Sequence, residues 1–240
     1  NIFVQPMQKG VNTIGRWVQS KTEAFQNYDA LLKENETLKD QLEQSQKQVA
    51  QYQQNSYELE RLQALYELDL QYYDYKKTAA RVISKDTGGW FQVFYVDKGT
   101  DDGVVEGCNV MYGNGLCGIV TEAGKDYAKV RAIIDDTSNV NGMILPSEAI
   151  CNVEGSASNY ENGYLIAENI DKDAEVGVGD QVVTSYVSSK YLSGINIGYV
   201  TKIEEDSNNL TKTAYITPAC VLSKIQEVLI VLQTKKTVSE

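Results

Sequence analysis

The 240-residue chain carries 22 basic and 33 acidic side chains, a net charge of −11, and it contains no histidine. Binding of duplex nucleic acid needs a basic face, so the acidic balance argues against a nucleic-acid partner. The absence of histidine excludes Ser-His-Asp and Cys-His nucleophile systems and removes the commonest zinc ligand. We interpret the acidity as a contribution to solubility.

The four cysteines form no C-x-x-C pair, so the sequence offers neither a zinc knuckle nor a thioredoxin-like motif. Each lies in an apolar, strand-like context, which favours buried small side chains over disulfides or ligands. They are Cys108, Cys117, Cys151 and Cys220. No apolar run of about 18 residues predicts a membrane span. Because the first residue is Asn1 and not methionine, we expect that a targeting segment can precede it.

A 3-4 repeat runs without a slip from Tyr28 to Leu59. An apolar repeat of about 3.5 residues keeps one seam facing a partner helix, as a left-handed coiled coil requires. Asn35 takes an a position, where a buried amide costs stability but specifies register and favours two parallel strands. The residues that we assign to the dimer seam are Leu31, Asn35, Leu38, Leu42, Val49, Tyr52 and Leu59.

Upstream of Tyr28 the same repeat continues through Val4, Met7, Val11, Ile14, Val18, Lys21 and Phe25. The helix is therefore predicted to start near Pro6, a residue that suits a first helical turn. Trp17 lies beside the seam. Two interpretations stay open for it, a resting place at a membrane interface or packing against the partner helix.

Beyond Leu59 the apolar stripe widens past the needs of a two-helix seam. A wider apolar face packs on something bulkier, so we expect the end of the helix to dock on the following domain. The predicted docking residues are Leu62, Leu65, Tyr66, Leu70 and Tyr73. We assign residues 1–75 to a coiled-coil stalk.

After Lys77 the period of the pattern changes to two. Short runs rich in Val, Ile, Thr and Tyr are separated by Gly, Asn and Asp, which predicts strands and turns. The runs cover 78–84, 90–97, 109–112, 116–122, 128–134, 150–153, 164–170, 181–185, 197–203, 213–217 and 226–232. Residues 76–240 are therefore predicted to form an all-β module of sandwich or barrel type, with closure as the way to hide its strand edges.

An internal repeat divides this module. Val104-x-x-Gly107-x-x-Val110 recurs as Val176-x-x-Gly179-x-x-Val182, and Gly118-Ile119-Val120-Thr121 recurs as Gly198-Tyr199-Val200-Thr201. The second copy holds eight more residues, which we place around residues 185–194. The repeat predicts two related small β-barrels or one duplicated sheet unit, with the division near residue 150. It leaves open whether the two lobes are consecutive or interleaved in the chain.

Two adjacent carboxylate pairs, Asp101–Asp102 and Asp135–Asp136, support the alternative of a hydrolase. Neighbouring side chains at a strand end point to opposite faces, so such a pair does not readily share one substrate bond. We interpret both pairs as turn residues. The sequence predicts no catalytic, cofactor-binding or metal-binding residues.

Taken in order, several segments resemble the MreC family of bacterial rod-shape proteins. They are Ala80-Arg81-Val82-Ile83, Trp90, Asp97-Lys98-Gly99, Gly103-Val104-x-x-Gly107-x-x-Val110, Gly115-Leu116-x-Gly118-x-Val120, Asp135-Asp136-x-Ser138, Gly179-Asp180-x-Val182-Val183-Thr184-Ser185 and Gly194-Ile195-x-Ile197-Gly198-x-Val200. The resemblance departs at residues 186–193, where the family usually has glycines and an aromatic-proline pair.

The resemblance implies a coiled coil followed by two six-stranded β-barrels, arranged as in chymotrypsin-like proteases but without a triad. It implies a single membrane helix upstream of Asn1, with this chain on the extracytoplasmic side of the cytoplasmic membrane. The implied partners are a second copy in dimers or filaments, the class B penicillin-binding transpeptidase, and MreD. The implied function is a non-catalytic scaffold that organises lateral cell-wall synthesis and controls rod shape.

An adaptor of a transport or secretion assembly, which also joins a coiled coil to β-barrels, is the alternative. Such adaptors need two antiparallel helices, and the sequence shows one helical segment.

Overall fold

The computed structural model describes residues 4–86, 92–206 and 210–235, with the side chains of the first helix described from Tyr28 onward except at Ala30. Trp90 lies outside the described residues, and the side chains of residues 4–27, Trp17 included, lie outside the described side chains. The chain divides into two compact units, residues 1–60 and residues 61–240.

Helix α1 spans Val4–Gln71, so it begins two residues before the predicted start at Pro6. Its sequence after Gly15 contains no Gly or Pro and is rich in Leu, Gln, Glu and Lys, which are strong helix formers. At its end, the Lys77 ammonium donates to the carbonyl oxygens of Asp69, at 2.7 Å, and of Tyr72. A cation at this position satisfies terminal carbonyls and complements the helix dipole.

The first barrel consists of six strands, which pair antiparallel in the closed order β1-β12-β3-β4-β5-β2. They are β1 (Lys77–Lys85), β2 (Val93–Val96), β3 (Asn109–Tyr112), β4 (Gly115–Ala123), β5 (Ala128–Ala132) and β12 (Glu227–Val231). A 3-10 turn, η1 (Thr100–Asp102), follows β2. Closure leaves the barrel no free sheet edge.

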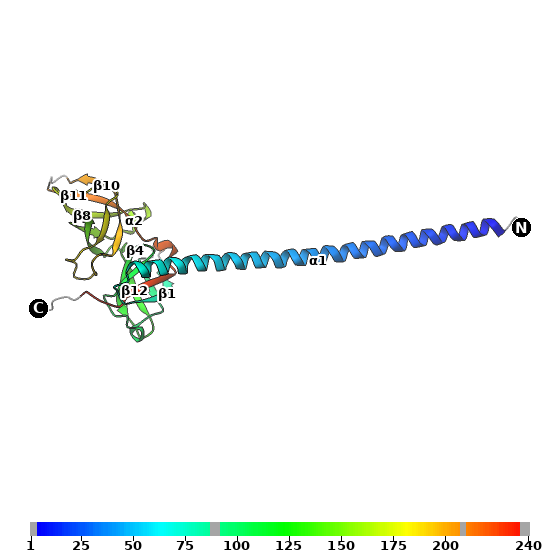
Figure 1. Ribbon diagram of the computed structural model, residues 1–240, viewed down its shortest axis with the longest axis horizontal. Helices are drawn as coiled ribbons and strands as arrows, with labels where there is room; N and C mark the ends of the chain where they lie inside the picture. Colours follow the sequence, from blue (N-terminus) through cyan, green and yellow to red (C-terminus); the bar gives the residue numbers. More distant parts are fainter. Residues whose placement is uncertain (1–3, 87–91, 207–209, 236–240) are drawn as a thin grey trace. The chain divides into compact units, whose positions relative to one another are not determined.

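The second barrel also closes antiparallel, in the order β10-β11-β8-β7-β6-β9. Its strands are β6 (Asn139–Leu145), β7 (Ala149–Glu154), β8 (Leu165–Asp171), β9 (Gln181–Thr184), β10 (Asn196–Glu205) and β11 (Thr211–Pro218). Strands β8, β10 and β11 are labelled in Figure 1. Helix α2 (Ala157–Glu161) precedes β8, and a 3-10 turn, η2 (Leu222–Lys224), precedes β12. The predicted fold class, a long helix followed by two six-stranded barrels, is confirmed.

The predicted boundary near residue 150 is wrong. That position lies in β7, which pairs with β6 along residues 139–154 and therefore belongs to the same barrel as β6. The division falls instead between β5 and β6, and β12 returns at the end of the chain to pair with β1 and β3. The barrels are thus interleaved, since the whole second barrel is inserted between the fifth and sixth strands of the first.

The internal repeat corresponds to equivalent hydrogen bonds in the two barrels. The backbone N–H of Gly107 donates to the carbonyl oxygen of Val120 at 2.9 Å, and that of Gly179 donates to Val200 at 2.8 Å. Both glycines have positive φ, of 87° and 98°, a conformation that disfavours any residue with a Cβ. The repeat therefore marks the same turn and strand pairing in each lobe.

Among the described residues, β6 is the one strand that the sequence did not predict. Its Asn-Val-Asn-Gly run is typical of a turn. Val140, Gly142 and Ile144 nonetheless alternate as buried positions. A Cβ on Gly142 would lie 2.8 Å from the Cys151 Sγ, so the missing side chain makes room for the neighbouring strand.

All four cysteines are free and buried, as predicted from their apolar context. Burial raises the pKa of the Cys151 thiol and of the Cys220 thiol to about 12. Both thiols are therefore neutral at physiological pH and behave as small apolar side chains.

Candidate functional site

The residues that we assigned to the dimer seam are all exposed. Among the apolar members, the exposed fraction runs from 51% for Val49 to 73% for Tyr52. Asn35, which is predicted to specify register, is exposed with them. A row of large apolar side chains left uncovered by its own chain is typical of an interaction surface.

The predicted docking face of α1 is wrong at four of its five positions. Leu62, Tyr66, Leu70 and Tyr73 are exposed, at 51% to 79%, and only Leu65 packs against the barrel core. The residues that do the docking are Leu65, Leu68 and Tyr72, with Leu68 only 2% exposed. Leu65 and Leu68 share one face of α1, and Tyr72, the residue after the helix, continues their 3-4 spacing. The predicted residues centre on the neighbouring stripe.

The docked face of α1 also carries an ion pair with β12. The Arg61 Nε lies 3.1 Å from the Glu227 Oε2, and the second guanidinium nitrogen donates to Oε1 at 3.1 Å. The Nε makes no hydrogen bond, so the contact with Glu227 consists of one charge-assisted hydrogen bond within an ion pair. The end of the helix is thereby held against the last strand of the first barrel.

Two tyrosines after α1 bind the second barrel. The hydroxyl oxygen of Tyr72 accepts the backbone N–H of Asn196 at 3.0 Å, and the Tyr75 hydroxyl donates to the Ser193 carbonyl at 2.9 Å. Burial raises the pKa of both phenols above the usual value. The segment that leaves the helix therefore contacts the start of β10 as well as the first barrel.

The eight extra residues of the second repeat form a loop that contacts the first barrel. Leu192 N–H donates to the Asn109 Oδ1 at 2.8 Å, and the Asn109 amide donates to the Lys190 carbonyl at 3.3 Å. Asn109 is fully buried, and Tyr191 of the loop is only 3% exposed. Sequence reasoning missed Asn109, although an amide at the start of an otherwise apolar strand is a usable signal.

The two carboxylate pairs are turn residues, as predicted. Asp102 accepts from the Lys98 ammonium at 2.8 Å and from Gly99 N–H at 3.3 Å, within the η1 turn. The Lys98 hydrogen bond lowers the pKa of Asp102 below its usual value. Asp135 accepts Thr137 N–H at 2.9 Å, and Asp136 accepts Ala157 N–H at 3.2 Å. Asp102 and Asp135 thus accept from backbone within their own turns, whereas Asp136 accepts from the first residue of α2, 21 residues further along the chain.

These features define a helix-led double β-barrel protein with an uncovered apolar helix face. A family model described as "Rod shape-determining protein MreC, barrel core" matches residues 82–232, which is more than half of the chain. The chain therefore belongs to the MreC family.

Two named proteins support this assignment. The "Cell shape-determining protein MreC" of Listeria monocytogenes is 30% identical over 161 residues, which are 65% of this chain and 54% of that protein. A solved structure named "MreC Lysteria monocytogenes" is 27% identical, covers 86% of this chain and all of that chain, and superposes with a TM-score of 0.63. The chain spans about half of the length of the Listeria protein.

A third similar structure contains a partner. The "Complex between Penicillin-Binding Protein (PBP2) and MreC from Helicobacter pylori" has a chain that is 20% identical, covers 66% of this chain and all of that chain, and gives a TM-score of 0.52. At this identity the likeness shows the fold. Within the part of this chain that the structure describes, no helix combines the length and apolar character needed to cross a membrane.

Proposed function

We propose that this chain is a non-catalytic scaffold that dimerises through α1 and presents its two barrels to the machinery of lateral cell-wall synthesis, and so helps to control rod shape. The observation that carries the proposal is the exposed 3-4 row of large apolar side chains on α1 in a chain of the MreC family. Such a row gains most from burial against an identical row in a parallel partner.

The dimer seam that we propose extends past Leu59. Tyr66, Leu70 and Tyr73 continue the same 3-4 repeat and are 64%, 55% and 79% exposed, because the barrels use the neighbouring stripe of the helix. A second copy that pairs along the whole repeat would cover these side chains too. In this proposal, Tyr66, Leu70 and Tyr73 pack in the dimer seam and not against the barrels.

The partner that we propose for the barrels is a class B penicillin-binding transpeptidase. The support is the solved Helicobacter pylori complex of an MreC with PBP2 and the shared double-barrel fold. MreD, a membrane anchor upstream of Asn1 and an extracytoplasmic position follow from the family resemblance and belong to the same proposal.

The absence of catalysis is also part of the proposal. The support is that Asp102 and Asp135 accept hydrogen bonds from backbone in their own turns, and that Asp136 accepts the backbone N–H of Ala157 in α2. The adaptor alternative requires a second long helix antiparallel to the first. Among the described residues α1 is followed by strands and by the five-residue α2, so no observation favours that alternative.

The test uses the whole chain and the purified outer domain of the transpeptidase from the same organism. We expect a dimer by multi-angle light scattering, binding to the immobilised transpeptidase, and no release of products from peptidoglycan fragments. Turnover of those fragments by the pure chain would contradict the scaffold assignment. A strictly monomeric chain at micromolar concentration would contradict the seam.

A further inference from the structure

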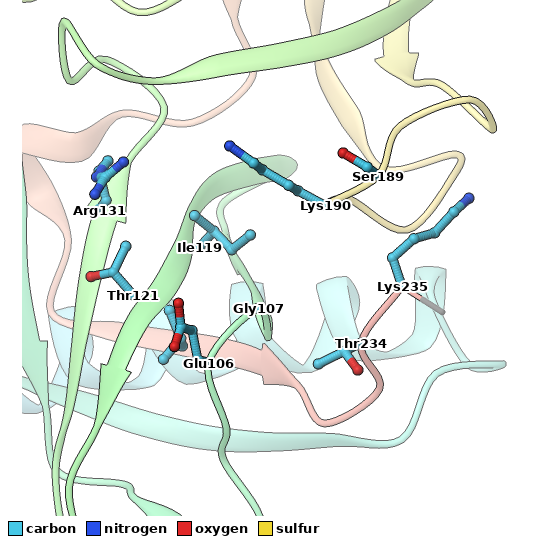
Figure 2. A pocket seen from close by; sticks show the side chains of 10 residues that line it. Glu106, Gly107, Ile119, Thr121, Arg131, Ser189, Lys190, Thr234 and Lys235 are labelled. Carbon is cyan, nitrogen blue, oxygen red and sulfur yellow. The ribbon is translucent and has the colours of Figure 1, made fainter. Parts of the chain in front are cut away.

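An open cleft on the first barrel gathers positive charge. It has a volume of about 550 Å³. Its walls come from three segments: strands β4 and β5 with the turn before β3, the loop after β9, and the chain after β12 (Figure 2). The lining residues are Glu106, Gly107, Ile119, Val120, Thr121, Arg131, Ser189, Lys190, Thr234 and Lys235.

The charge of this cleft is opposite to that of the chain. Three cations, Arg131, Lys190 and Lys235, and one carboxylate, Glu106, line the cleft, whereas the chain as a whole has a net charge of −11. Figure 2 shows the Lys190 ammonium directed toward the side of the cleft on which Arg131 lies. A concave site lined by one sign of charge concentrates the field on ligands of the opposite sign.

The cations of the cleft are not neutralised within the described chain. The ion pairs among residues 4–86, 92–206 and 210–235 involve other side chains, and Arg131 is half-buried. Lys235 donates to the carbonyl oxygen of Tyr186 at 2.9 Å, a contact that leaves its charge unpaired. A partly desolvated guanidinium without a carboxylate gains from an external anion.

The cleft is held in place by buried structure. Lys190 N–H donates to the Ser188 Oγ at 3.3 Å, and the Lys190 carbonyl accepts from the buried Asn109 amide at 3.3 Å. Arg131 projects from β5, whose neighbours Val130 and Ala132 are fully buried. The backbones that carry two of the three cations are therefore fixed before any ligand binds, which lowers the entropy cost of binding.

We propose that this cleft binds an acidic peptide segment of a partner protein, with a carboxylate on Arg131 and a second near Lys190. The planar guanidinium accepts a carboxylate through two parallel hydrogen bonds. Two carboxylates balance the excess of two positive charges left by three cations and Glu106. A long polyanion such as a phosphate polymer is disfavoured, because the acidic remainder of the chain repels it.

The test measures binding of acetyl-Glu-Ala-Glu-amide to the whole ¹⁵N-labelled chain by amide NMR at low salt. We expect shifts at Gly107, Arg131 and Lys190, a dissociation constant near the millimolar range, and weakening on addition of salt. Acetyl-Gln-Ala-Gln-amide, which has the same shape without charge, should bind at least tenfold more weakly. Equal binding of the two peptides, or no binding of the acidic peptide, would overturn the proposal.

Variants separate the cleft from general surface charge. Arg131→Gln with Lys190→Gln should weaken the acidic peptide at least tenfold, whereas Lys125→Gln, which removes an exposed charge outside the cleft, should leave it unchanged. Glu106→Gln should tighten binding several-fold, a gain that a loss of folding cannot produce.

Unchanged affinity for the acidic peptide in both cleft variants would refute the assignment. If inorganic phosphate binds more tightly than the acidic peptide and shifts the same amide signals, the cleft is a phosphate site and the peptide proposal is overturned. Peptide binding is measured by NMR and dimer formation by light scattering, so failure of the cleft proposal can be distinguished from failure of the scaffold proposal.

Discussion

The hydroxyl oxygen of Tyr72 accepts the backbone N–H of Asn196 at 3.0 Å and so joins the end of α1 to the first residue of β10. Asn196 is buried, so bulk water cannot replace the Tyr72 hydroxyl as the acceptor of its N–H. A single side chain at the end of the helix thus contacts the backbone of the second barrel.

Removal of this hydroxyl should therefore destabilise the barrels. We expect Tyr72→Phe to lower the free energy of unfolding by about 1–2 kcal/mol, because a buried N–H loses its acceptor. Urea unfolding followed by circular dichroism measures the change. Tyr73→Phe is the matched control, since Tyr73 is 79% exposed, and it should change the stability little. If both variants change the free energy of unfolding equally, the Tyr72–Asn196 hydrogen bond stabilises the chain no more than a hydrogen bond to water does.

Asn109 should matter for the attachment of the loop between β9 and β10. Asn109→Ala removes the acceptor of Leu192 N–H and the donor to the Lys190 carbonyl, so we expect a loss of about 2–3 kcal/mol. Hydrogen exchange should also become faster at Leu192. Lys190→Ala keeps the backbone bonds and should cost less than about 0.5 kcal/mol. A stable Asn109→Ala chain with unchanged exchange would contradict the role of this amide.

The two stripes at the end of α1 should respond differently to truncation. Leu68→Ala is expected to cost about 2–4 kcal/mol of unfolding free energy, because Leu68 is buried against the barrel core. Leu70→Ala should leave the stability of the isolated subunit nearly unchanged and weaken self-association instead. Chemical unfolding and sedimentation equilibrium separate the two effects. A large loss of subunit stability in Leu70→Ala would mean that the exposed stripe docks after all.

The central part of the seam should be sensitive to charge. Leu38→Lys with Leu42→Lys places two ammonium groups at seam positions and should convert a dimer into a monomer by light scattering. Thr37→Lys with Gln44→Lys adds the same charge at outward positions and should leave the dimer intact. If both double variants stay dimeric, α1 does not associate along this row.

The buried thiols predict a decline of stability at alkaline pH. Burial raises the pKa of Cys151 and Cys220 to about 12 in the folded chain, whereas in the unfolded chain they ionise near 9. Their contribution is therefore complete below pH 9 and is lost as the pH rises toward 12, at about 1.4 kcal/mol per pH unit for each thiol. Between pH 8 and pH 10, the free energy of unfolding should fall less steeply with pH in Cys220→Ala than in the parent chain. Rapid reaction of all four thiols with a thiol reagent at pH 8 in the folded chain would contradict their burial.

The sequence predicted those parts of the fold that depend on local pattern. The strand at Asn109–Tyr112 has the predicted bounds, and the internal repeat identified the equivalent turns at Gly107 and Gly179. β6 was missed because Gly142 looks like a turn residue until the proximity of Cys151 is known. That proximity is a property of the closed barrel and not of the local sequence.

The candidate surfaces were predicted less completely, for the same reason. The sequence identified the apolar stripes on α1, but the choice between Leu68 and Leu70 depends on which face the barrel covers. The contact of Asn109 with Lys190 joins positions 81 apart in the chain. The cleft likewise brings together Arg131 and Lys190, which are distant in the sequence. Contacts of such sequence separation follow from topology, which periodicity does not encode.

The return of β12 to the first barrel has a consequence for the order of folding during synthesis. All six strands of the second barrel lie between residues 139 and 218, so that barrel can close before the end of the chain has emerged. The first barrel begins earlier in the sequence but stays open between β1 and β3 until Glu227–Val231 is available. The lobe that is made first is therefore completed last, and a chain that stops short of β12 retains one closed barrel and one with two free edges.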